Sequence, residues 1–260
     1  MTEQPEPLST EKFAQLLKVL KGVDGVELKL SVPDADRQSA VARLGMDPFD
    51  AQIRQVVFFD TPDLALNRGG VVVRARRVQH KPGDFVVKLR PLTPDEVPKA
   101  VRKSPAFGVE VDVMPGGFVC SGAMKAEVDD ATVKEVITGR RPLRKALSKE
   151  QRELFSANAP DGVELDQLSV LGPIQVLKLK FTPEGFSRRL VAELWFYPDG
   201  SRILELSTKC EPTEAFEASA EARVFLEARG IDLHAPQQTK TKAALEFFVS
   251  ELASVEAAVE

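Results

Sequence analysis

The chain has few of the residues that build disulfide-rich, zinc-binding or membrane proteins. Its 260 residues include two cysteines, Cys120 and Cys210, which lie far apart and form no CxxC motif, so neither a disulfide framework nor a zinc site is indicated. No apolar run approaches the roughly 18 residues of a spanning helix. The first residues lack the basic and apolar regions of a signal peptide. These absences predict a cytoplasmic protein without a membrane partner.

Histidine and net positive charge are also scarce. His80 and His234 are the two histidines, and because neither has a recognisable catalytic partner nearby in the sequence, each is more typical of a loop histidine than of a general base. The formal net charge is −4, which argues against a dedicated nucleic-acid binder, since such domains usually carry a basic surface. We therefore expect no nucleic-acid partner, although a basic site inside an acidic protein is compatible with this charge.

The most informative stretch that is present covers residues 58–90. It contains two predicted strands with cations at alternate positions, Arg74 and Arg76 on the first and Lys88 and Arg90 on the second. Successive side chains of a strand point to opposite faces, so each pair of cations shares one face. The opposite face of both strands is apolar and has to be covered. The cationic face must look into solvent or into a charged cavity.

Other predicted strands repeat this pattern of one charged and one apolar face. The further cations are Lys29, Lys178, Lys180 and Lys209, and the anions are Glu27, Glu110, Asp112, Glu164, Asp166, Glu193 and Glu205. About eight or nine such strands fit an α+β fold in which a closed antiparallel β-barrel with a charged interior is wrapped by helices. An open sheet with one wet face also fits the pattern. A bound triphosphate would offset the cost of burying several cations together.

The predicted helices lie at the two ends of the chain and in its middle. An N-terminal helix is expected within residues 1–22, barrel strands within 24–210, a helical insertion at about 121–155 and C-terminal helices within 213–258. Residues 162–168 are expected to form a strand that carries Glu164 and Asp166 on one face. The sequence shows no internal repeat, and we interpret residues 1–260 as one domain.

The run FFDTPDLALNRGGVVVRARR, followed by FVVKLR, resembles the signature of the CYTH proteins, also called triphosphate tunnel metalloenzymes. VELKLSVP, VEVDV and GVELDQLSVLGP are similar to further segments of this family, which includes thiamine triphosphatases, inorganic triphosphatases and class IV adenylyl cyclases. The resemblance implies a tunnel whose basic residues hold a triphosphate. Taken together with the charged strand faces, it gives these candidates for phosphate binding: Lys29, Arg74, Arg76, Lys88, Arg90, Arg152, Lys178 and Lys180. It also implies acidic ligands for Mg²⁺ or Mn²⁺, here Glu27, Glu110, Asp112 and Asp166, with Glu193 and Glu205 as replacements.

The chain departs from the family at acidic positions. Gly25 stands where the opening motif has its first glutamate, and Lys178 and Lys180 stand where a late strand usually carries two. Lysine neutralises phosphate oxygens, but unlike a metal it cannot ionise and orient a water. Two functions therefore stay open: a metal-dependent triphosphatase and a non-catalytic binder of a small phosphorylated polyanion. Adenylyl cyclase is a third that rests on the family alone, and no residue identifies a catalytic group.

Overall fold

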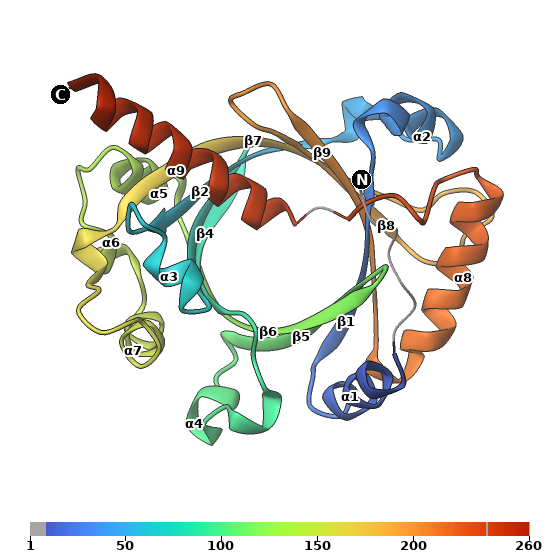
Figure 1. Ribbon diagram of the computed structural model, residues 1–260, viewed down its shortest axis with the longest axis horizontal. Helices are drawn as coiled ribbons and strands as arrows, with labels where there is room; N and C mark the ends of the chain where they lie inside the picture. Colours follow the sequence, from blue (N-terminus) through green and yellow to red (C-terminus); the bar gives the residue numbers. More distant parts are fainter. Residues whose placement is uncertain (1–8, 238, 260) are drawn as a thin grey trace.

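Nine strands close into a barrel in the computed structural model, which describes residues 9–237 and 239–259 (Figure 1). The order around the barrel is β1-β5-β6-β4-β3-β2-β7-β8-β9, and β9 pairs with β1. Among the hydrogen-bonded pairs of these strands, only β1 and β5 are parallel. The strands are β1 (Gly25–Val32), β2 (Gln52–Asp60), β3 (Val71–Val78), β4 (Lys81–Leu89), β5 (Phe107–Met114), β6 (Gly117–Val128), β7 (Ser169–Phe181), β8 (Leu190–Phe196) and β9 (Arg202–Cys210). The expected closed α+β barrel is confirmed, with one parallel seam in a mostly antiparallel sheet.

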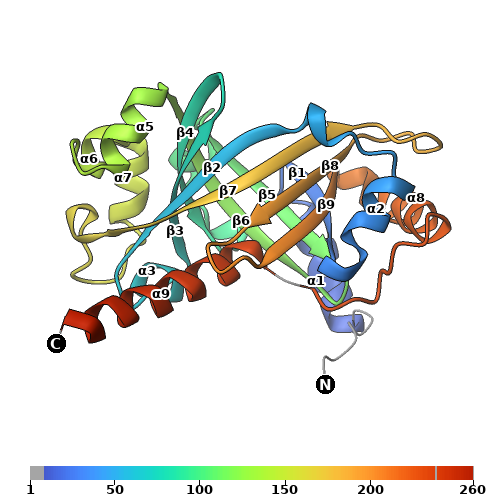
Figure 2. The same ribbon diagram turned by 90° about the horizontal axis from the view of Figure 1, so that it is seen from above.

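Helices surround the barrel and cross one of its ends (Figures 1 and 2). They are α1 (Thr10–Leu20), α2 (Arg37–Arg43), α3 (Ala65–Arg68), α4 (Lys99–Arg102), α5 (Asp130–Ile137), α6 (Leu143–Ala146), α7 (Lys149–Ser156), α8 (Ala215–Ala228) and α9 (Lys240–Val259). Short 3-10 turns are η1 (Asp34–Asp36), η2 (Pro48–Asp50), η3 (Pro94–Glu96), η4 (Leu165–Gln167) and η5 (Pro212–Glu214). Within the described residues, no helix has the length and apolar character needed to cross a bilayer. Residues 1–8 of the expected N-terminal helix lie outside the described residues.

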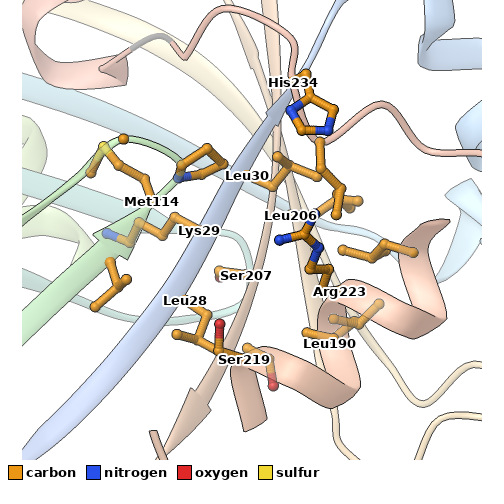
Figure 3. A pocket seen from close by; sticks show the side chains of 17 residues that line it. Leu28, Lys29, Leu30, Met114, Leu190, Leu206, Ser207, Ser219, Arg223 and His234 are labelled. Carbon is orange, nitrogen blue, oxygen red and sulfur yellow. The ribbon is translucent and has the colours of Figure 1, made fainter. Parts of the chain in front are cut away.

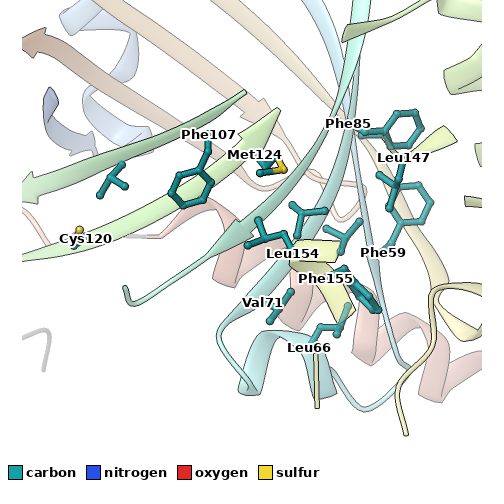
Figure 4. Packing of buried hydrophobic residues seen from close by; sticks show 14 of the residues in the cluster. Phe59, Leu66, Val71, Phe85, Phe107, Cys120, Met124, Leu147, Leu154 and Phe155 are labelled. Carbon is teal, nitrogen blue, oxygen red and sulfur yellow. The ribbon is translucent and has the colours of Figure 1, made fainter. Parts of the chain in front are cut away.

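The outward face of the strands forms the main hydrophobic core with the helical insertion. Phe59 and Phe85 of the barrel belong to one buried cluster with Leu154 and Phe155 of α7 (Figure 4). Gln151 of α7 is fully buried, and its side-chain nitrogen donates to the carbonyl oxygens of Phe85, at 2.8 Å, and Met124, at 3.1 Å. This packing turns the apolar face of β4 and β6 outward and leaves their polar face for the interior.

Two segments differ from the sequence-based prediction. The helix expected from residue 121 begins only at Asp130, because residues 117–128 form β6 between β4 and β5. Its Ala, Met, Lys and Glu residues favour helix, but pairing on both sides satisfies the backbone and outweighs that preference. The strand expected at residues 162–168 contains instead the 3-10 turn η4, where Glu164 and Gln167 form a reciprocal cap.

Candidate functional site

The register of the barrel brings most of the predicted charged residues to its inner face. Residues directly opposite each other on paired strands share a face, and the outer face is the one packed against helices. The predicted residues on the inner face are Lys29, Arg74, Arg76, Lys88, Arg90, Lys178, Glu27, Glu110, Asp112, Glu193 and Glu205. The alternation read from the sequence therefore points the charges inward.

Arg74 and Lys88 form a basic wall on the adjacent strands β3 and β4. Both side chains are partly buried, and Arg74 Nε is buried without a hydrogen-bond partner. Neither residue has an ion pair among the described residues. Burial lowers the pKa of Lys88 to about 8, an effect that Asp112 opposes and the neighbouring cations reinforce. Partly buried cations without an ion pair in the described part of the chain have donors and charge that an anion could satisfy.

The first pair of inner carboxylates is Glu27 on β1 and Asp112 on β5, which lie directly opposite each other. Lys29 Nζ lies 3.3 Å from Glu27 Oε2 and 3.0 Å from Asp112 Oδ2. Arg90 Nη1 donates to the same Asp112 oxygen at 2.7 Å. Burial opposes ionisation of Asp112, but the surrounding cations hold its pKa below the usual value. This pair is therefore ionised and already neutralised by the chain itself.

The second pair is Glu193 on β8 and Glu205 on β9, again directly opposite each other. Lys178 Nζ lies 2.7 Å from Glu193 Oε1. Lys240, in the first turn of α9, contacts Glu193 Oε2 and lies 2.7 Å from Glu205 Oε1. The sequence did not indicate Lys240, because it lies on a helix and belongs to no alternating strand pattern.

A further charged group contains Arg76 and Asp84, which face each other on β3 and β4. Arg76 Nε donates to Asp84 Oδ2 at 3.0 Å, whereas Asp84 Oδ1 is buried without a partner. Arg54 of β2 lies close enough for its charge to interact with both Arg74 and Arg76. Arg54 and Asp84 were not predicted as site residues, although each occupies an inward position of the same alternation.

Several predicted residues lie elsewhere. Arg152 is on α7, outside the barrel, where its Nη1 donates to the carbonyl oxygens of Leu147, at 2.5 Å, and Arg144, at 3.1 Å. Asp166 is in η4 and pairs with Arg144 on the surface, at 3.0 Å. These placements correct the expectation that both face the tunnel, because the helical insertion and η4 pack on its outer side. Lys180 differs from these two: the register gives it an inward position, opposite Val191 at the end of β7, but its side chain is exposed.

The remaining predicted pair also lies toward solvent. Glu110 Oε1 lies 2.5 Å from Lys209 Nζ, and the two side chains are about half exposed, at 43% and 58%. Although both residues occupy inward positions on their strands, their exposure places this pair near an open part of the barrel. Glu110 therefore does not join the enclosed carboxylate pairs described above.

The carboxylates do not form a metal centre in this arrangement. Among the side chains that the structure describes, those of residues 9–237 and 239–250, there is no group of three or more His, Cys, Asp or Glu that could hold a metal ion. A lysine ammonium bridges each inner carboxylate pair, and Mg²⁺ or Mn²⁺ would compete with that ammonium for the same oxygens. The residues as placed therefore do not fit the divalent metal that the family resemblance implies.

Charge fills only part of the interior. Val56, Phe58 and Trp195 on the inner face pack with Ala244 and Leu245 of α9 in a buried apolar cluster. Helix α9 crosses this end of the barrel (Figures 1 and 2). The interior, which we expected to be charged, is thus apolar beneath α9 and charged elsewhere.

Two cavities adjoin Lys29. A small one of about 50 Å³ lies inside, between Lys29, Arg90, Glu205 and Lys240. A larger one of about 440 Å³ lies between β1, β9 and α8, and also touches Lys29 (Figure 3). Two of the side chains that line the small cavity are themselves paired, because Lys240 Nζ lies 2.7 Å from Glu205 Oε1.

Comparison with known proteins finds similarity in structure but not in sequence. No protein-family model and no curated protein sequence matches the chain. A candidate adenylate cyclase from Bacillus halodurans is 14% identical, with 85% of this chain and 97% of that chain covered and a TM-score of 0.59. A candidate adenylyl cyclase from Hippeastrum, described as having a dominant triphosphatase activity, is 17% identical, with 84% and 93% covered and a TM-score of 0.62. At these identities the likeness establishes the fold.

Proposed function

We propose that this chain, a divergent CYTH-like barrel, binds a triphosphate or a similar short polyphosphate inside the barrel. The observation that carries the proposal is the basic wall of Arg74 and Lys88, whose side chains have no ion pair among the described residues, with Arg74 Nε buried and unpartnered. Leaving a guanidinium nitrogen without a partner is costly. Phosphate oxygens would supply the missing acceptors and offset the cationic charge.

The neighbouring charges support an elongated polyanion over a single phosphate. Arg54 and Arg76 continue the cationic surface on one side of Arg74, and Lys29 and Arg90 lie beside Lys88. A chain of phosphates can contact several of these groups at once, whereas one phosphate cannot. The triphosphatase activity described for the Hippeastrum structure agrees with a triphosphate ligand.

The test is calorimetric titration of the purified chain with sodium tripolyphosphate in EDTA. Substituting Arg74 by Met should weaken binding by about tenfold or more, because a charge-assisted contact is lost. Arg77→Met is the matched control: Arg77 lies on the same strand but bonds Gln55 and Asp130, and its loss should leave the affinity within about twofold. Absence of tripolyphosphate binding to the wild type, with or without Mg²⁺, would overturn the proposal.

Metal-dependent hydrolysis is the second candidate function. It is favoured by the activity described for the Hippeastrum structure, and it requires a divalent ion to displace a lysine that bridges one of the carboxylate pairs. The assay is phosphate release from tripolyphosphate, ATP and thiamine triphosphate with Mg²⁺ or Mn²⁺ between about pH 7 and 10, with cyclic AMP monitored in the ATP reaction. Binding without product would leave the chain as a polyphosphate binder.

A further inference from the structure

We propose that the ammonium of Lys240 is a built-in cation that takes the place of a divalent metal at the Glu193–Glu205 pair. The barrel then needs no metal at this position in order to accept its polyanion. That the polyanion binds without this metal rests on the proposed function. That Lys240 takes the place of the metal concerns the chain alone. No sequence pattern indicated this role, since Lys240 reaches the pair from α9 and not from a strand.

The geometry is that of a bridged carboxylate pair. Glu193 and Glu205 lie directly opposite each other on β8 and β9, where two like charges repel. Lys240 Nζ contacts Glu193 Oε2 and lies 2.7 Å from Glu205 Oε1, so a single cation is shared by both. The three side chains are between 10% and 18% exposed. A bound divalent ion would join the same two oxygens.

The electrostatic balance of the group is complete without a metal. Lys178 holds the other oxygen of Glu193 at 2.7 Å, so two ammonium groups neutralise two carboxylates. Lys240 also lies over the ring of Trp195, 5.1 Å from its centre, which further stabilises the cation. Burial disfavours the charged form, yet Glu193 and Glu205 hold the pKa of Lys240 above its usual value, so the ammonium persists at neutral pH.

Other contacts fix α9 on the barrel independently of this charge. Ala244 and Leu245 are buried against the barrel in the apolar cluster beneath the helix. The hydroxyl of Tyr197 donates to the backbone carbonyl of Lys240 at 3.1 Å. Removing only the ammonium should therefore leave the helix in place, which makes variants of Lys240 informative.

The Glu27–Asp112 pair has the same organisation. Lys29 Nζ lies within 3.3 Å of an oxygen of each carboxylate, although here the lysine comes from β1 itself. Both enclosed carboxylate pairs are thus bridged by an internal ammonium. The Lys240 bridge is the one that can be removed without altering a strand of the barrel.

The first experiment measures Mn²⁺ binding by electron paramagnetic resonance in the absence of phosphate. The K240A variant should bind one Mn²⁺ at least tenfold more tightly than the wild type, because two carboxylates and the freed space then admit a hydrated ion. The double variant K240A/E205Q should lose this site. K242A is the control, since Lys242 is exposed and pairs with Glu246 on the same helix. Equal Mn²⁺ affinity of K240A and wild type would overturn the proposal.

The second experiment compares tripolyphosphate affinity in EDTA and in Mn²⁺. The wild type should bind equally, within about twofold, in both buffers. K240M keeps the packing on Trp195 and loses only the charge; it should bind at least tenfold more weakly in EDTA, because uncompensated carboxylates repel the anion. If the wild type binds tripolyphosphate only in the presence of metal, the proposal that Lys240 replaces the metal is wrong. A wild type that binds under neither condition would instead remove the proposed function and leave the Mn²⁺ result to decide the role of Lys240.

Discussion

Lys29 and Asp112 meet across the parallel seam of the barrel, with Lys29 Nζ 3.0 Å from Asp112 Oδ2. Arg90 donates to the same oxygen, so one carboxylate, 2% exposed, carries two cations. Parallel pairing of β1 and β5 sets this contact, since it puts Glu27 and Asp112 side by side. The seam is thus joined by charge as well as by the backbone.

Removing the charge of Asp112 should destabilise the fold. The D112N variant leaves Lys29 and Arg90 without their shared partner, and breaking a buried pair in this way costs about 3 kcal/mol. Urea unfolding at neutral pH measures the loss. D166N is the control: Asp166 pairs with Arg144 on the surface, and its change should stay within about 0.5 kcal/mol. Equal effects of the two variants would contradict this account of the seam.

Tripolyphosphate binding should weaken as the pH rises through about 8. Burial lowers the pKa of Lys88 to about 8, so the ammonium is present below that pH and is lost above it. Titrations between about pH 6.5 and 9.5 should show affinity falling in the upper half of the range. K88M should bind more weakly at pH 7 and lose most of this dependence. An unchanged pH profile in K88M would assign the dependence to another group.

Arg152 should be dispensable for binding. Its guanidinium donates to carbonyl oxygens of the helical insertion outside the barrel. The R152M variant is expected to keep its tripolyphosphate affinity within about twofold while losing some stability, about 1 kcal/mol for the hydrogen bonds. Calorimetry and urea unfolding measure the two effects. A tenfold loss of affinity with unchanged stability would instead support the original prediction that Arg152 binds phosphate.

Gln151 should be important for stability but not for binding. Its side-chain nitrogen satisfies the carbonyl oxygens of Phe85 and Met124 in a fully buried position. Q151L leaves both oxygens without this donor, at a cost of about 2 kcal/mol. K149A is the control on the same helix, where the Lys149 side chain is 81% exposed. Urea unfolding of both variants checks the difference, and a Q151L variant as stable as K149A would rule out this role.

The sequence predicted the charged face of the barrel because alternation is a local property of a strand. Spacing alone assigned Arg74 and Arg76 to one face of their strand, and likewise Lys88 and Arg90. The register of the closed barrel then placed both faces inside. The apolar positions between them required a cover, which the helices provide. This pattern fitted both a closed barrel of eight or nine strands and an open sheet with one wet face. The family resemblance favoured the barrel, which the structure confirms.

Local preference failed where long-range pairing decided the outcome. Residues 121–128 favour helix by composition, yet they form part of β6 because β4 and β5 offer backbone partners on both sides. Asp166 and Arg152 looked like inward residues, but the turn η4 and helix α7 lie outside the barrel.

By itself, the sequence determined which side chains share a face, and hence that cations and carboxylates would gather on one face of the strands. Closure of the barrel placed that face inside. Only the tertiary structure decided which charges neutralise one another. Lys240 reaches Glu193 and Glu205 from a helix 47 and 35 positions further along the chain, whereas Arg74 and Lys88 remain without an ion pair among the described residues. Charge pairing depends on distances of a few ångströms between remote segments, and no spacing within one segment encodes those distances.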